Sequence, residues 1–142
     1  MAKIKTGELI DAALDWAVQE IEYQRMVAEG EHVKQWALDD HRAGASINPY
    51  STDWLWGGPI LDREITKVFR NVGGTWSAMI LKDVPIPPED RGTSLALTRR
   101  AQWNGAGPTP LVAVMRCFCC SKMGDTVEVP EELTCSPTSK ND

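Results

Sequence analysis

Residues 48–59, Asn-Pro-Tyr-Ser-Thr-Asp-Trp-Leu-Trp-Gly-Gly-Pro, constrain the possible folds of this chain more than any other segment. The segment combines three aromatic side chains with turn-forming residues and ends in Gly-Gly-Pro. Because Gly and Pro interrupt regular backbone and Asn, Asp and Ser favour turns, we predict a shaped surface loop here. A loop that holds aromatic rings beside hydrogen-bonding groups suits binding better than catalysis.

Length, composition and charge limit the class of protein. The chain has 142 residues, of which 42% are hydrophobic and 25% charged, as expected for one globular domain. We predict a single domain over residues 1–134 and a polar, disordered tail over residues 135–142. The formal net charge of −5 argues against general nucleic-acid binding. Without a bilayer-spanning apolar run or a signal peptide, we expect no membrane association and a cytoplasmic location.

Hydrophobic spacing and helix-boundary residues predict about three helices. The first covers residues 6–28, with Thr6 as its N-cap. The second covers residues 59–69, with Pro59 in its first turn. The third covers residues 110–123, with Thr109 as its N-cap. Residues 31–47 fit either a helix or a strand, and we favour a helix.

The remaining apolar segments predict a small sheet. Residues 75–81 and 94–101 are strand candidates, and the proline-rich segment 85–92 between them predicts an antiparallel hairpin with a long connection. Residues 126–129 alternate like a further short strand. We therefore predict an α+β fold in which a small antiparallel sheet packs against about three helices.

The aromatic loop is the first candidate binding site. Its rings could stack on a planar group, with each stacked base contributing about 1–3 kcal/mol. Its hydroxyl and carboxylate groups could bind a sugar, and its glycines would allow close backbone approach. Alternatively, one Trp anchors the loop to the core and the polar groups make local turn bonds. The predicted ligand-binding residues of the loop are Tyr50, Ser51, Thr52, Asp53, Trp54, Gly57 and Gly58.

Two predicted helix starts could add an anion site. Backbone N–H groups at residues 58–60 and 109–111 could hold a phosphate or a carboxylate. Arg63 and Arg116 could supply charge-assisted hydrogen bonds to the same group, so we add Arg63, Thr109 and Arg116 to the predicted ligand-binding residues. The alternative is ordinary capping and internal salt bridges, for example between Arg63 and Glu64 or Asp62.

The cysteines and histidines do not form a recognisable catalytic or metal motif. Cys117, Cys119 and Cys120 lie toward the end of a helix, where the dipole disfavours thiolate, so we expect reduced, buried side chains. His32 and His41 are expected on the solvated surface. No nucleophile motif, phosphate loop or dinucleotide fingerprint is present. We therefore predict no catalytic residue, no metal site and no cofactor.

Three segments resemble a known family. They are residues 7–18, residues 50–60, and residues 107–117 together with 124–133, in the same order as in that family. The chain resembles the NinX-like proteins of tailed phages, a domain of unknown function. The resemblance implies a phage accessory protein made in the bacterial cytoplasm and implies no settled activity. Leu55-Trp56 stands where family members often carry Ala-Gln.

These observations lead to three functional hypotheses. The first is a counter-defence protein that sequesters a small nucleotide-derived host immune signal without chemistry. The second is an inhibitor that binds a host defence protein through exposed aromatic residues and an acidic surface. The third is a nucleotide-cleaving enzyme that uses Asp53, Asp62 or Glu64 as its acid–base group. A homo-oligomer is expected in each case.

Overall fold

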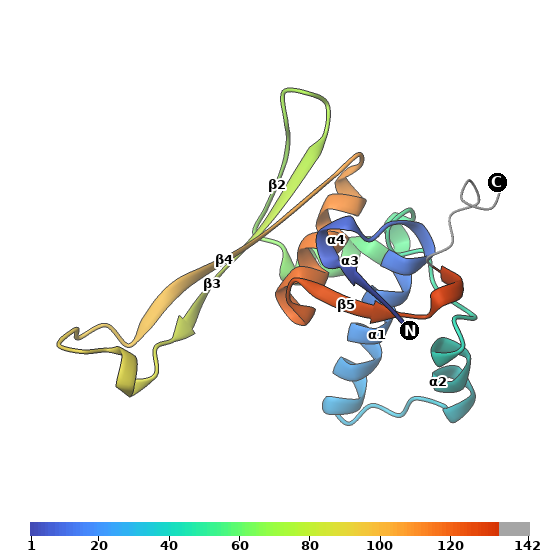
Figure 1. The fold of residues 1–142 in the computed structure, drawn as a ribbon, viewed down its shortest axis with the longest axis horizontal. Coiled ribbons are helices and arrows are strands. Elements are labelled where there is room, and N and C mark those ends of the chain that lie inside the picture. The colour runs from blue at the N-terminus through green and yellow to red at the C-terminus, as the bar shows by residue number, and fades with distance from the viewer. Residues whose placement is uncertain (134–142) are drawn as a thin grey trace.

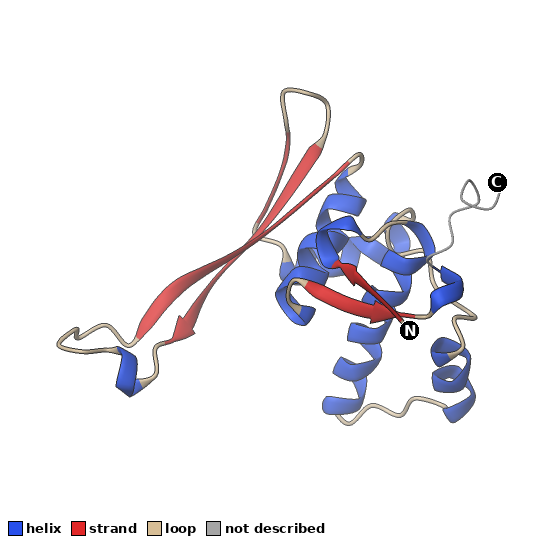
Figure 2. Cartoon of the chain, in the orientation of Figure 1, coloured by secondary structure: helices blue, strands red, loops and turns tan. Residues whose placement is uncertain are grey.

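The computed structural model describes residues 1–133, which form four α-helices and two antiparallel sheets (Figures 1 and 2). The helices are α1 (Asp11–Ala28), α2 (Gln35–Arg42), α3 (Trp54–Glu64) and α4 (Pro110–Met123). One sheet pairs β1 (Ala2–Lys5) with β5 (Thr126–Val129). The other has the order β2 (Lys67–Arg70), β3 (Trp76–Pro85), β4 (Thr98–Gly107). The predicted α+β class is confirmed, while the predicted tail at 135–142 lies outside the described residues.

Helix α4 lies at the centre of the fold. Its residues from Leu111 to Met115 and from Cys117 to Cys119 are buried, so this helix is enclosed on nearly every side. Side chains of α1, α3, β3 and β5 complete the hydrophobic core, among them Leu14, Val18, Ile60, Ile80 and Val129. The predicted N-cap is confirmed, because the Thr109 hydroxyl accepts a hydrogen bond from the Val112 N–H at 3.2 Å.

Strand β4 passes directly over the backbone of α4. A Cβ atom at Gly105 would lie 2.4 Å from the Cys117 nitrogen and 2.5 Å from the Ala113 carbonyl oxygen. Such contacts are far below van der Waals distance, so only glycine allows the strand to pack this closely on the helix. The second strand lies at 98–107 and not at the predicted 94–101, because its pairing with β3 runs through Gly105 to Gly107.

The predicted antiparallel hairpin is confirmed, but its strands are longer than expected. The register runs from Trp76 opposite Gly107 to Pro85 opposite Thr98. The distal part of this ribbon projects away from the helices as a twisted two-stranded extension (Figures 1 and 2). We call residues 82–101, which include the connection between the strands, the β-arm.

Helix α3 begins earlier and ends earlier than predicted. The Asp53 carboxylate accepts a hydrogen bond from the Leu55 N–H at 2.9 Å and caps a helix that starts at Trp54, five residues before Pro59. Pro59 cannot donate to the Leu55 carbonyl, but Leu55 is 75% exposed and solvent can satisfy that oxygen. Residues 67–69, predicted as helix, belong to β2, because they pair with β3.

The N-terminal segment also differs from the prediction. Residues 2–5 form β1 on the edge of β5, and α1 begins at Asp11. Thr6 does not cap the helix, because its hydroxyl donates to the Gly124 carbonyl at 2.8 Å. The favoured helix in residues 31–47 is confirmed as α2.

Candidate functional site

Three helices begin around one surface hollow of about 400 Å³, which we call the helix-start hollow. It lies where the first residues of α1, α3 and α4 meet. Its lining comes from three segments that are far apart in the sequence: Ile10, Asp11, Ser51, Thr52, Trp54, Pro108, Thr109, Pro110, Leu111 and Val112. The volume falls within the range of small-molecule sites in proteins.

Hydrogen bonds from α1 fix the segment that precedes α3. The buried Asp15 carboxylate accepts the Ser51 N–H at 2.7 Å, and the Gln19 side-chain oxygen accepts the Asn48 N–H at 2.9 Å. Burial raises the pKa of Asp15, while hydrogen bonding by Ser51 acts in the opposite direction. The hollow is therefore bordered by a segment that α1 holds at two points.

Gly57 allows α3 to lie against the same segment. A Cβ atom at this position would be 2.4 Å from the Tyr50 carbonyl oxygen and 2.8 Å from Leu111 Cδ2. Gly58 has no such restriction, since its nearest neighbour would be a Trp54 ring carbon at 4.0 Å. The first glycine of the pair thus brings α3 and α4 together, which places their N-termini beside each other.

The three helix starts differ in how they are capped. Asp53 caps α3 and Thr109 caps α4, whereas Ile10 at the start of α1 makes no side-chain cap. Asp11, the first residue of α1, has a positive φ of 53°, which is uncommon for a residue other than glycine. The positive ends of three helix dipoles therefore converge on the hollow, and one of them has no side-chain acceptor for its first N–H groups.

Trp54 provides the aromatic surface of the hollow. Its side chain is 55% exposed and also borders an adjoining hollow of about 510 Å³ that Trp76 helps to line. Tyr50 is buried, and its ring packs edge-on against Trp56 with 5.8 Å between the ring centroids. Trp54 is thus available to stack on a ligand, while Tyr50 anchors its segment to the core.

The structure brings together some of the predicted site residues and separates others. Ser51, Thr52, Trp54 and Thr109 line the helix-start hollow, and their binding role stays a prediction. The predicted residues that do not line it are Tyr50, Asp53, Gly57, Gly58, Arg63 and Arg116. Sequence reasoning missed Ile10 and Asp11, because the start of α1 was expected at residue 6, which placed both residues inside a helix.

Arg63 is engaged in internal ion pairs. Its guanidinium donates to Glu22 at 2.6 Å and to Glu64 at 2.9 Å, and it lies over the Phe118 ring. Burial by itself lowers the Arg63 pKa, but the bonds to both carboxylates outweigh this effect and raise it. The alternative of an internal salt bridge with Glu64 therefore describes Arg63 better than a ligand contact.

Arg116 is also committed to the protein. Its Nε donates to the Leu9 carbonyl oxygen and its Nη1 to the Ala106 carbonyl oxygen, each at 2.8 Å. Burial lowers the pKa of this guanidinium, with Glu8 acting in the opposite direction. Arg116 therefore joins the segment before α1 to β4, and its guanidinium is not free to bind an anion in the hollow.

The prediction that His41 is solvated was wrong. Only 2% of His41 is exposed, and its ring stacks on Trp16 with centroids 4.6 Å apart. Because the Gln19 amide nitrogen can only donate, His41 Nδ1 accepts at 3.2 Å and Nε2–H donates to Glu20 at 2.7 Å. This bond is the main reason that the Glu20 pKa is lowered, and the network joins α1 to α2.

Two of the three cysteines in the described part of the chain are buried as predicted, and the third is not. Cys117 and Cys119 are buried and free, and Cys120 is partly exposed. Burial raises the pKa of Cys117 to about 12 and raises that of Cys119 as well, which keeps both thiols protonated at neutral pH. Cys135 lies outside the described residues.

Comparison with known proteins identifies a phage family. Residues 5–122 match the family described as Bacteriophage P22, NinX, which covers most of the chain. No curated protein matches the sequence. Over residues 1–133, no helix has both the length and the apolar character that a bilayer crossing needs.

Proposed function

The chain belongs to the NinX family of bacteriophage P22, and from this premise we propose that it binds and sequesters a small nucleotide-derived signal of the bacterial host without altering it. The family match agrees with a phage accessory protein. The observation that carries the proposal is the convergence of three helix N-termini on one hollow beside an exposed indole.

Each part of a nucleotide has a matching group in the helix-start hollow. The half-exposed Trp54 ring could stack on a base, as aromatic side chains do in many proteins that bind single-stranded nucleic acid. The N–H groups of the first turn of α1, which lack a side-chain cap, suit a phosphate oxygen. The Asp11 carboxylate and the Thr52 hydroxyl suit the hydroxyl groups of a ribose.

The adjoining hollow supports a ligand larger than a mononucleotide. Trp54 and Pro110 border both hollows, and Trp76 offers a second aromatic surface beyond them. A ligand with two planar groups could therefore contact both sides of Trp54. This feature favours cyclic dinucleotides and ADP-ribose-type molecules over single nucleotides.

Several features support binding without chemistry. Asp53 is occupied as the cap of α3. The Glu64 pKa is lowered although burial acts to raise it, because Arg63, Lys122 and Lys82 surround the carboxylate. A general acid or base at neutral pH needs a pKa near 7, so Glu64 does not suit the enzyme hypothesis.

Isothermal titration calorimetry tests the proposal. The folded protein is titrated with cyclic dinucleotides, cyclic and linear ADP-ribose-type nucleotides, and mononucleotides. We expect one of the first two classes to bind stoichiometrically. The Trp54→Ala variant should bind it about 10-fold to 100-fold more weakly, because one stacking contact is lost.

The matched control is Trp36→Ala, which removes an indole of similar exposure on α2, far from the hollow in sequence. This variant should keep the affinity of the parent protein. Ligand released by heating the complex should have an unchanged mass. No binding to any member of the panel by folded protein would refute the proposal, and a changed mass would refute its non-catalytic part.

A protein-binding role is the second candidate, and the exposure of α3 favours it. Trp54, Leu55 and Trp56 are 55%, 75% and 39% exposed on one short helix. Exposed aromatic residues in such a cluster are common in interaction hot spots. Pull-down of host proteins on the immobilised chain tests this function. It is favoured if a host protein binds the parent chain stoichiometrically, fails to bind the Leu55→Asp variant, and no nucleotide binds.

A further inference from the structure

The β-arm carries two aliphatic side chains, Leu95 and Leu97, that its own chain leaves exposed. Ile80 lies opposite Trp103 in the register, and this face of the ribbon packs toward the core. Because side chains alternate between the faces of a strand, Val84 and the cross-strand Arg99 lie on the same face farther out. The two strands continue beyond the body of the protein (Figure 2), and the Lys82–Ala101 pair lies on this face between the Val84–Arg99 pair and the core.

The end of the β-arm is also apolar. The Ile86 N–H donates to the Leu97 carbonyl oxygen at 2.9 Å, which extends the ladder by one pair of large aliphatic side chains. Leu97 is 63% exposed and Leu95 is 95% exposed. A two-stranded ribbon is only marginally stable in water without a surface to pack on. These side chains therefore suit a surface that another molecule covers.

We propose that the β-arm is a dimerisation element that docks in the α1–α2 groove of a second copy of this chain. The α1–α2 groove is a mostly apolar depression of about 410 Å³ lined by Tyr23, Val27 and Leu38, with Glu20, His41 and Arg42. Its apolar lining matches the aliphatic side chains at the end of the arm. In a two-fold dimer, both arms dock at once in equivalent contacts.

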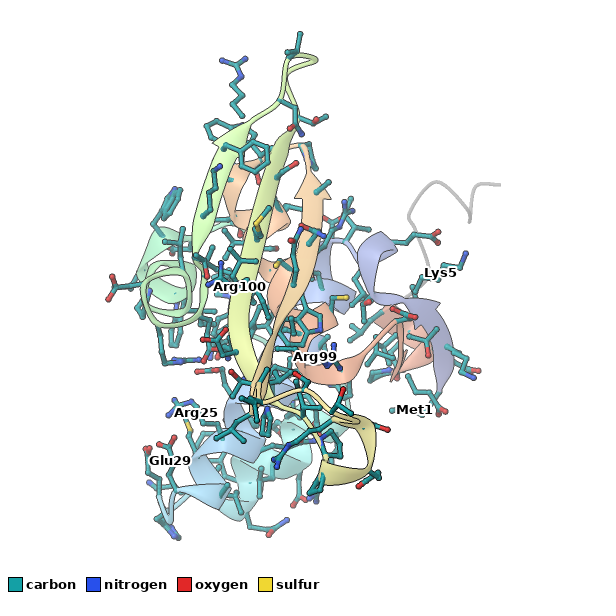
Figure 3. All side chains as sticks on the ribbon, turned by 90° about the vertical axis from the view of Figure 1, so that its left-hand side faces the viewer. Met1, Lys5, Arg25, Glu29, Arg99 and Arg100 are labelled. Atoms are coloured by element: carbon teal, nitrogen blue, oxygen red, sulfur yellow. The ribbon has the colours of Figure 1, made fainter. Side chains whose placement is uncertain are left out.

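Charge complementarity selects a second copy as the occupant. The β-arm carries four basic and three acidic side chains, although the whole chain has a net charge of −5. The segment 20–42, which contains the groove lining, carries six acidic and three basic side chains, so the surroundings of the groove are acidic. Figure 3 shows Arg99 and Arg100 on the arm, and Arg25 and Glu29 toward the far end of α1.

Individual side chains fit this assignment. Arg99 forms no ion pair within residues 1–133, whereas Arg100 lies 3.9 Å from Asp83. At the groove, Asp39 is exposed and lies 3.7 Å from the lining residue Arg42. An unpaired cation on the arm and an exposed carboxylate beside the groove can pair between copies, which would fix the register of the contact.

Sedimentation velocity over a range of concentrations tests the proposal. The parent chain should be a reversible dimer. Leu97→Asp and Arg99→Glu should each raise the dissociation constant by at least about 10-fold, through lost apolar contact and reversed charge respectively. Val72→Asp is the matched control, because Val72 is fully exposed in the β2–β3 turn and should have no effect.

A charge exchange identifies the docking surface. Asp39→Lys should weaken the dimer as Arg99→Glu does, and a mixture of the two variants should form a heterodimer with both contacts restored. Far-UV circular dichroism checks that each variant is folded. A monomeric parent chain, a dimer insensitive to the arm substitutions, or a mixture that stays monomeric would each overturn the proposal.

Discussion

Removal of the Asp15 carboxylate should release the segment that borders the helix-start hollow. Ser51 is 2% exposed, and its N–H donates to Asp15 at 2.7 Å. In Asp15→Ala this buried N–H loses its acceptor, so we expect the free energy of unfolding to fall by about 2–3 kcal/mol. In Asp15→Asn an acceptor oxygen is kept, so the loss should be about 1 kcal/mol or less.

The pH dependence of the free energy of unfolding tests the same interaction independently. The pKa of Asp15 is raised above its ordinary value of 3.8, chiefly by burial, so the folded protein binds this proton more tightly than the unfolded chain. Its contribution to stability is therefore fully present below pH 3.8 and declines as pH rises through the folded pKa. The Asn variant lacks this decline, so it should gain stability relative to the parent as pH rises.

Urea unfolding followed by tryptophan fluorescence measures both effects, since the chain has six tryptophans. The parent, Ala and Asn proteins are compared at several pH values between acidic and neutral. An Asn variant that loses as much stability as the Ala variant would show that the buried charge, and not the acceptor oxygen, holds this segment. That result would refute the reasoning.

Four further predictions follow from the packing and the pKa shifts. Gly105→Ala should lower the free energy of unfolding by at least about 3 kcal/mol in urea titrations, since its Cβ would overlap the α4 backbone. Gly58→Ala, with open space in a helix, should instead raise it by about 0.5–1 kcal/mol. Glu20→Gln should make stability less sensitive to acid below pH 4.5, because the lowered Glu20 pKa, due mainly to His41, gives stability that is lost as pH falls through the folded value. Cys117 should resist thiol reagents at pH 8 until the protein unfolds, which mass spectrometry after timed alkylation would detect.

Local sequence signals predicted the elements whose ends are marked by specific residues. The start of α4 was identified from its N-cap Thr109, because capping depends on a few neighbouring atoms. The start of α3 was missed because Pro59 was assigned to the first turn, whereas Asp53 is the cap. The Pro ring is tolerated on the exposed side of that helix, which only the tertiary arrangement determines.

Long-range contacts explain the other differences. Strand β1 forms only because β5 lies beside it, and no local pattern in residues 2–5 indicates this partner. The burial of His41 likewise depends on Trp16 and Gln19 of another helix. The candidate site was partly predictable, since both segments that carry Trp54 and Thr109 were identified, but the contribution of α1 required the fold.

The most direct test of the helix-start hollow is a two-dimensional amide NMR titration of the folded protein with the tightest ligand of the calorimetric panel. We expect the largest shift changes at the amides of residues 11–13, 52–54 and 111–112, together with the Trp54 indole N–H. Changes confined to the α1–α2 groove or the β-arm would contradict the account, because binding would then occur away from the helix starts.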